Sequence, residues 1–93
     1  MQLTGEIRQK IAGISRDHGA HSVRLFGSYA RGEAHEGSDL DLLVEMDQGR
    51  SLLDLIDLQH ALERELGIAV DVLTPASLSP YLRESVEKDA VAL

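Results

Sequence analysis

The stretch GSYARGEAHEGSDLDLLVE, residues 27–45, decides both how this sequence folds and what it can bind. A Gly-Ser pair opens the stretch, ten residues follow, and Asp39-Leu40-Asp41 then leads into an apolar run. The alternation of polar and apolar residues over 38–45 predicts a β-strand. The stretch is therefore either a turn followed by a solvated strand, or a site that holds metal ions and phosphates.

The two aspartates, Asp39 and Asp41, occupy positions i and i+2 of the predicted strand. Their side chains therefore lie on the same side, with α-carbons roughly 6.5–7 Å apart. Two such carboxylates can converge on a hard cation such as Mg²⁺. The simpler interpretation is that this face of the strand is solvated, because a short Asp-x-Asp pattern often arises by chance.

The Gly-Ser pair follows directly on residues 22–26, which have the pattern of a short strand. Gly27 would let a phosphate approach the backbone closely, and the start of a helical turn offers free N–H groups. Ser28 adds a hydroxyl group, and Arg31 could reach the same anion from the next turn. The alternative is an ordinary strand-to-helix turn in which Ser28 caps the helix.

A third aspartate, Asp71, lies in AVDVL between two valines. This is an unusual place for a charge in a strand that looks buried, unless the strand lies at an edge of the sheet with Asp71 facing water. Taken together, the aspartates of two strands and the Gly-Ser pair predict a two-metal site for phosphoryl transfer, with metals roughly 4 Å apart.

The rest of the chain has the pattern of helices that cover a sheet. Residues 3–17 and 51–66 carry apolar side chains at helical spacing, residues 68–73 have the pattern of a third strand, and Ser79-Pro80 opens a last helix. We therefore expect an α/β (α+β) fold, in which helices cover a small mixed three-stranded sheet. The order of the strands does not follow from the sequence.

Composition limits the classes of function that are open. Residues 1–93 are expected to make one domain. The formal charge of −7, from 16 acidic and 9 basic residues, opposes direct binding to nucleic acid and suits metal ions or a basic protein partner. The absence of cysteine and of a long apolar run leads us to expect a cytoplasmic protein without a membrane span.

The segments LFGSYARGEAHEGSDLDLLVE and IAVDVLTP resemble the minimal nucleotidyltransferases, a family within the DNA-polymerase-β-type nucleotidyltransferase superfamily. The resemblance covers nearly the whole chain and implies a nucleotidyltransferase fold. It also implies that Asp39, Asp41 and Asp71 are catalytic residues that hold two Mg²⁺ ions, with Asp71 helping to activate an acceptor hydroxyl.

The same resemblance implies that the substrate is ATP. Gly27 and Ser28 would contact its β- and γ-phosphates, and Arg31, in the GS-x-A-R-G run, is expected to be a further nucleotide-binding residue. The acceptor hydroxyl would attack the α-phosphate, and pyrophosphate would leave.

Minimal nucleotidyltransferases commonly occur beside a small helical partner, a HEPN-type ribonuclease toxin. The resemblance therefore implies an antitoxin that transfers AMP from ATP to a tyrosine of that toxin. Two alternatives stay open: a non-catalytic antitoxin that neutralises its partner by binding alone, and a nucleotidyltransferase that modifies a small molecule.

Two further side chains leave their roles open. Arg24 lies between Val23 and Leu25, where it is either solvated or near the triphosphate. Tyr29 follows the Gly-Ser pair and either packs as a structural ring or stacks on a nucleotide base.

Overall fold

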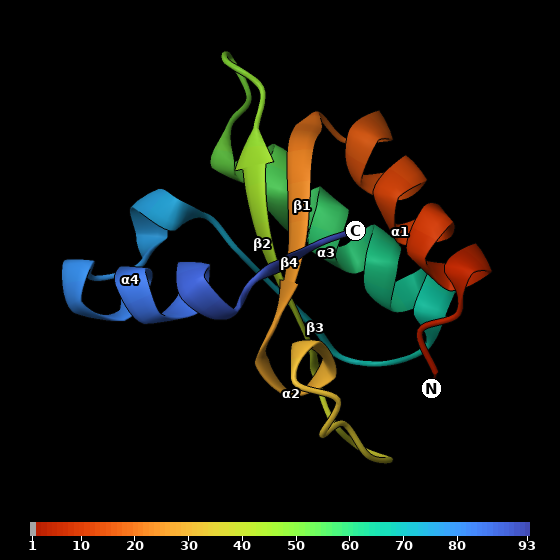
Figure 1. The fold of residues 1–93 in the computed structure, drawn as a ribbon. Coiled ribbons are helices and arrows are strands. Elements are labelled where there is room, and N and C mark those ends of the chain that lie inside the picture. The colour runs from red at the N-terminus through yellow and green to blue at the C-terminus, as the bar shows by residue number, and fades with distance from the viewer. Residues whose placement is uncertain (1) are drawn as a thin grey trace.

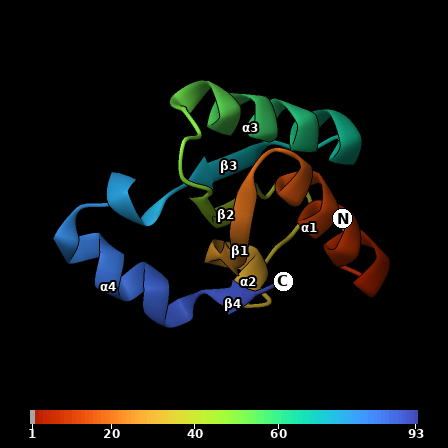
Figure 2. The same cartoon turned by 90° about the horizontal axis from the view of Figure 1, so that it is seen from above.

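The computed structural model describes residues 2–93 and has a central sheet with helices on both of its faces (Figures 1 and 2). Along the chain the elements are α1 (Gly5–Asp17), β1 (Ala20–Phe26), α2 (Gly27–Ala30), β2 (Leu40–Met46), α3 (Leu52–Leu66), β3 (Val70–Leu73), the 3₁₀ turn η1 (Pro75–Ser77), α4 (Pro80–Asp89) and β4 (Val91–Ala92). This confirms the expected α/β class.

The sheet is mixed and has the strand order β3-β2-β1-β4. β1 runs antiparallel to both β2 and β4, while β2 and β3 are parallel. The expected count of three strands was therefore one too low, because the two-residue strand β4 returns from α4 and pairs with Arg24 and Leu25 of β1. A strand of two residues is too short to have an alternating pattern, so the sequence does not predict it.

One face of the sheet forms the hydrophobic core under α1 and α3. In β2 the residues Leu40, Leu42 and Val44 are fully buried on this face. They pack with Ile11 of α1 and with Leu58 and Leu62 of α3. Burial of several such side chains supplies most of the driving force for folding, at about 1.5–3 kcal/mol for each one.

The helix ends follow from local chemistry. Thr4 caps α1 by accepting a hydrogen bond from the Ile7 amide at 3.2 Å. Before α3, the Ser51 amide donates to the Asp54 carboxylate at 2.9 Å, which is half of a capping box. Gly67 then ends α3 in the left-handed conformation, with a φ of 71°.

The other face of the sheet is covered more sparsely. α4 lies on the opposite side of the sheet from α3 (Figure 2), and none of its residues is buried. Leu82, on its first turn, is 52% exposed. This thinly covered face is the one that carries the aspartates. Within residues 2–93, the helices are all too short or too polar to cross a membrane.

Candidate active site

The structure brings Asp41 and Asp71 together as direct partners on neighbouring strands. In the parallel pairing of β2 with β3, Asp41 is in register with Asp71, as Leu40 is with Val70. Partners in register point to the same face of a sheet. The two carboxylates therefore stand side by side on the face opposite the α1 and α3 helices, whereas Leu40 and Val70 are buried in the core.

The pairing of these two carboxylates leaves negative charge poorly compensated. The pKa of Asp41 is raised from 3.8 to about 6, first by burial and then by repulsion from Asp71 and a hydrogen bond to Asp71. Repulsion from Asp39 acts in the same direction, and the positive charge of Arg31 opposes it. Such a site gains stability from any cation that binds it.

Gly27 closes the site from the side of β1. Phe26, the last residue of β1, pairs with Asp41, so the chain turns into α2 directly beside this carboxylate. Gly27 has a φ of 73°, and a Cβ placed on it would collide with a carboxylate oxygen of Asp41 and lie 3.1 Å from its Cγ. Only glycine combines this conformation with this approach.

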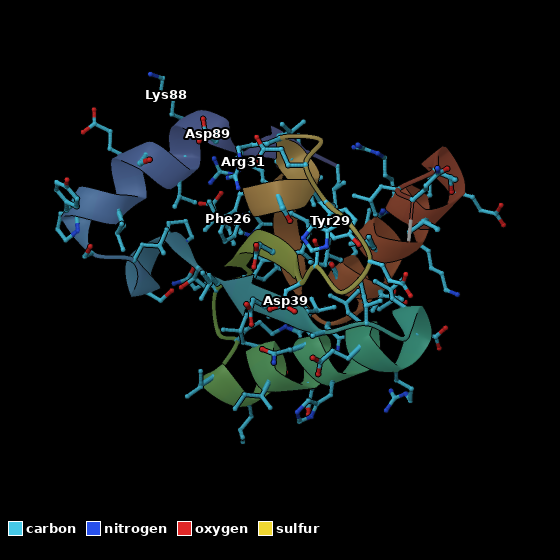
Figure 3. The ribbon with its side chains drawn as sticks, turned by 90° about the horizontal axis from the view of Figure 1, so that it is seen from below. Phe26, Tyr29, Arg31, Asp39, Lys88 and Asp89 are labelled. Atoms are coloured by element: carbon cyan, nitrogen blue, oxygen red, sulfur yellow. The ribbon has the colours of Figure 1, made fainter. Side chains whose placement is uncertain are left out.

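Ser28 lies on the short helix α2 that starts at Gly27, and Arg31 lies at its C-terminal end. Phe26, rather than Ser28, is the residue at the N-cap position, and Ser28 is the second residue of the helix. Arg31 follows the last residue of α2 and is exposed, with its Nε donating to Glu33 at 3.0 Å. Figure 3 shows Arg31 on the side of α2 that faces the end of α4, where Asp89 is labelled.

Asp39 stands just before β2 and is exposed. It borders a hollow of about 320 Å³ that is also lined by Tyr29, Ser38 and Ile68. Tyr29, labelled in Figure 3, packs against the core cluster, which is one of the two roles that the sequence left open. It also lines this hollow.

The residues present fit a divalent cation. Carboxylate oxygens are the ligands that Mg²⁺ prefers, and such an ion would offset the repulsion from Asp71 and Asp39 that adds to the effect of burial on the pKa of Asp41. Across residues 2–93, no three acidic or histidine side chains are already converged into a metal-ligand set. The preformed part of the site is the pair Asp41 and Asp71, and Asp39 would have to turn in from its exposed position.

A larger hollow, of about 440 Å³, lies away from this chemistry. It is lined by Arg16, His21, Asp47 and Leu93, at the far end of β1 from Gly27. His21 pairs there with Asp47 at 3.1 Å. Gly27, Asp39, Asp41 and Asp71 do not border it, so its size does not make it the active site.

The sequence also left the environment of Arg24 undecided. Arg24 of β1 shares the face of Asp41, and its guanidinium lies near Glu87 of α4 and Glu45 of β2. An arginine between two core residues of a strand has the same local pattern whether it is solvated or buried. Only the return of α4 across this face shows that it is covered.

This arrangement of a glycine turn against paired aspartates agrees with comparison to known proteins. The family model for the nucleotidyltransferase domain matches residues 7–93, and the chain belongs to this family. The family resemblance expected from the sequence is thereby confirmed.

Two relatives are similar over most of the chain. A protein of Methanocaldococcus jannaschii with the provisional name protein adenylyltransferase is 49% identical over 86 residues, which cover 92% of each chain. The protein adenylyltransferase MntA of Thermococcus cleftensis is 41% identical over 73 residues, which cover 78% of this chain and 74% of the relative.

Two solved structures share the fold. One, described as a minimal nucleotidyltransferase, has a TM-score of 0.84 at 50% identity and covers 92% of this chain and 88% of its own. The other, a toxin–antitoxin complex with AMP-PNP, has a TM-score of 0.79 at 28% identity and covers 91% of this chain and 70% of its own. The nucleotidyltransferase fold expected from the sequence is confirmed.

Proposed function

We propose that this protein is an antitoxin that transfers AMP from ATP to a tyrosine hydroxyl of a cognate HEPN-type toxin and releases pyrophosphate. Membership of the nucleotidyltransferase family, the similarity to proteins named protein adenylyltransferases and the similarity to a toxin–antitoxin complex with an ATP analogue support the proposal. The domain that carries it spans residues 1–93.

The contact between Gly27 and Asp41, with Asp71 paired beside it, is the observation that carries the proposal. A phosphate that lies against the Gly27 backbone is within reach of both carboxylates. Phosphate and carboxylate groups repel one another, so this arrangement is useful only when cations lie between them. Adenylyl transfer from a nucleotide is a reaction that needs such an arrangement.

In the proposed complex, the backbone of Gly27 and the hydroxyl of Ser28 bind the β- and γ-phosphates, and Arg31 adds positive charge beside them. Asp39, Asp41 and Asp71 hold two Mg²⁺ ions. When bound, Mg²⁺ supplies Lewis-acid charge at the α-phosphate and at the leaving pyrophosphate.

The carboxylate of Asp71 orients the acceptor hydroxyl and takes up its proton. The oxygen of the tyrosine then forms a bond to the α-phosphorus, while the bond from this phosphorus to the pyrophosphate oxygen breaks. Pyrophosphate leaves along the side of Gly27 and Ser28, and the tyrosine keeps AMP in a phosphodiester linkage.

The acceptor reaches the aspartates from the sparsely covered side of the sheet. Within residues 2–93, the helix α4 on this side of the sheet has no buried residue (Figure 2). We therefore assign the remaining wall of the site to the toxin, without direct binding of nucleic acid. A cytoplasmic location suits both an ATP-dependent reaction and a chain without cysteine.

The test is transfer of label from ATP to the toxin. Purified protein, ATP labelled on the α-phosphate, Mg²⁺ and the cognate HEPN protein are incubated together, and label on the HEPN protein is measured. The Asp41→Asn and Asp71→Asn variants are each compared with Asp57→Asn, an exposed aspartate on α3 that serves as the matched control.

We expect label on the toxin with the wild type and with Asp57→Asn, and a loss of at least about 100-fold in both active-site variants. Neutralisation of the toxin without ATP, and equally by Asp41→Asn, would instead establish an antitoxin that acts by binding. Pyrophosphate release with small hydroxyl compounds but not with the toxin would establish a small-molecule nucleotidyltransferase.

A further inference from the structure

Arg24 is a partly buried cation, with a side chain that is 25% exposed and an Nε atom that is buried. Among the buried side-chain nitrogens and oxygens of residues 2–93, Nε of Arg24 is the one that has no hydrogen-bond partner. Natural proteins rarely leave a buried donor unpaired, because the group has lost its water and gained nothing in exchange. We therefore ask whether this donor binds a ligand.

The remaining contacts of this guanidinium are long. Its Nη2 lies 3.6 Å from a carboxylate oxygen of Glu87 on α4 and 4.0 Å from a carboxylate oxygen of Glu45 on β2. Hydrogen bonds between a guanidinium and a carboxylate are about 2.7–2.9 Å long. Two carboxylates therefore hold Arg24 electrostatically, and its buried Nε keeps a donor for a closer partner.

Arg24 belongs to the same face of the sheet as the candidate active site. In the antiparallel pairing of β1 with β2, Phe26 is opposite Asp41 and Arg24 is opposite Leu43. Arg24 and Asp41 are thus diagonal neighbours on one face, a relation that places α-carbons about 7–8 Å apart. Arginine is long enough to reach across this distance, toward the turn at Gly27.

Helix α4 is the element that holds this arginine, and it is itself weakly held. None of its residues is buried, and it lies across the face that carries the aspartates (Figure 2). Its Glu87 is shared between two arginines, Arg24 at 3.6 Å and Arg83 at 3.8 Å. Half-exposed ion pairs contribute little to stability, so α4 can be displaced at small cost.

We propose that Arg24 binds the triphosphate of the nucleotide, and that Glu87 of α4 occupies this guanidinium while no nucleotide is bound. The inference rests on the proposed function, since it assigns a further substrate-binding residue to the same site. A triphosphate offers more negative charge than one carboxylate and accepts two parallel hydrogen bonds from a guanidinium. Nucleotide binding therefore takes Arg24 from Glu87 and loosens α4.

Calorimetric titration of the full chain with the non-transferable analogue α,β-methylene-ATP and Mg²⁺ tests this inference. Arg24→Gln is expected to bind the analogue about 10-fold more weakly, the loss of one charge-assisted contact, and Arg24→Lys to have an intermediate affinity. Glu87→Gln is expected to bind it about 3-fold more tightly, because the competitor for Arg24 is gone.

Arg83→Gln is the matched control, since Arg83 pairs with the same Glu87 but belongs to α4 itself. Its affinity is expected to stay within about twofold of the wild type. Thermal unfolding of each variant shows whether it is folded. If Arg24→Gln does not fold, Arg24→Lys and Glu87→Gln still test the inference.

The opposite signs of the two changes separate nucleotide binding from a merely structural role. If Arg24 only anchors α4, the Arg24 and Glu87 variants will shift the affinity in the same direction or leave it unchanged, and the inference is overturned while nucleotide binding stands. If the wild type itself binds no analogue, the proposed function falls, and this inference falls with it.

Hydrogen exchange of α4 gives a second readout. Both the Glu87→Gln substitution and saturation of the wild type with the analogue are expected to speed amide exchange over residues 83–89, because each one releases the link between Arg24 and α4. Exchange that stays unchanged or slows on addition of the analogue would contradict the inference.

Discussion

Replacement of Asp41 by asparagine is expected to stabilise this protein in the absence of metal. The folded state raises the pKa of this carboxyl from 3.8 to about 6, so the ionised form is less favourable in the folded chain than in the unfolded one. Asparagine has nearly the same shape and cannot ionise. It removes the burial cost of the charge and its repulsion from Asp71, and the neighbouring carboxylate still finds a hydrogen-bond donor.

The magnitude follows from the size of the pKa change. At about 1.4 kcal/mol for each pH unit, a fully buried group would contribute about 3 kcal/mol. Asp41 is only partly buried, and screening by water reduces the expected gain to about 1 kcal/mol. For a domain of this size, that gain raises the melting temperature by about 4–8 °C.

The sign of the pH dependence is fixed by the direction of the shift. Because the pKa of Asp41 is raised in the folded state, its ionisation destabilises the fold. This destabilisation is fully present above about pH 6 and disappears as the pH falls below the ordinary value of 3.8. The difference in melting temperature between Asp41→Asn and the wild type is therefore expected to be largest near pH 8 and close to zero at the acid end.

The assay is thermal unfolding by circular dichroism from about pH 4 to pH 8 in a chelating buffer, with Asp57→Asn as the matched control. Addition of Mg²⁺ near pH 8 is expected to raise the melting temperature of the wild type and to have a smaller effect on Asp41→Asn. A variant that melts at or below the wild-type temperature near pH 8 would refute this account of the site.

Further substitutions test the packing around the site and the caps. Gly27→Ala is expected to destabilise the fold by more than Gly67→Ala. The two glycines have similar φ values, 73° and 71°, but only a Cβ at position 27 would meet Asp41. Equal losses of unfolding free energy in chemical denaturation would exclude that contact. The same Gly27 variant is expected to lose transfer activity by about 100-fold or more, and Gly67→Ala to keep it, in the labelling assay. Leu62→Ala in the core is expected to cost about 2–5 kcal/mol of unfolding free energy, and a loss under about 1 kcal/mol would contradict the full burial of Leu62. The pKa of Asp54 is lowered, chiefly by the hydrogen bond from the Ser51 backbone, so the capping contribution of Asp54 is present above the unfolded-state pKa and is lost as the pH falls through the lower folded-state value. An Asp54→Asn variant whose melting temperature follows that of the wild type throughout the acid range would contradict this.

The parts of the fold that were predictable from the sequence are those with a local pattern. The alternation around Leu40 and Leu42 gave β2, the helical spacing of Leu58 and Leu62 gave α3, and the glycine at 67 marked its end. Each of these signals arises from residues a few positions apart. They predict an element whatever the rest of the chain does.

The parts that the sequence left undetermined depend on which elements meet in space. β4 has two residues and exists as a strand because α4 returns to the edge of β1. The one-turn spacing of Leu82 and Val86 indicates a helix but does not show what covers it. Leu82 is 52% exposed, and α4 rests over the face around Arg24 rather than over the core beneath α1 and α3.

For the candidate site, too, some features were predictable from local sequence and others depended on how the strands pair. The prediction rested on the Gly27-Ser28 pair occurring together with the aspartates at 39, 41 and 71, because each pattern alone has an ordinary structural explanation. That Asp41 and Asp71 would be in register depended on a parallel pairing of β2 with β3, which no local pattern determines. Asp39 remains a predicted ligand, since its side chain is exposed beside the pair.

The most direct measurement is a crystal structure of this protein with α,β-methylene-ATP and Mn²⁺ in place of Mg²⁺, in which anomalous scattering locates the ions. We predict that the ions lie between the carboxylates of Asp41 and Asp71 and the phosphates, and that the phosphates lie against the backbone of Gly27. Ions or phosphates bound elsewhere, with the Asp41 and Asp71 carboxylates free of metal, would contradict the account.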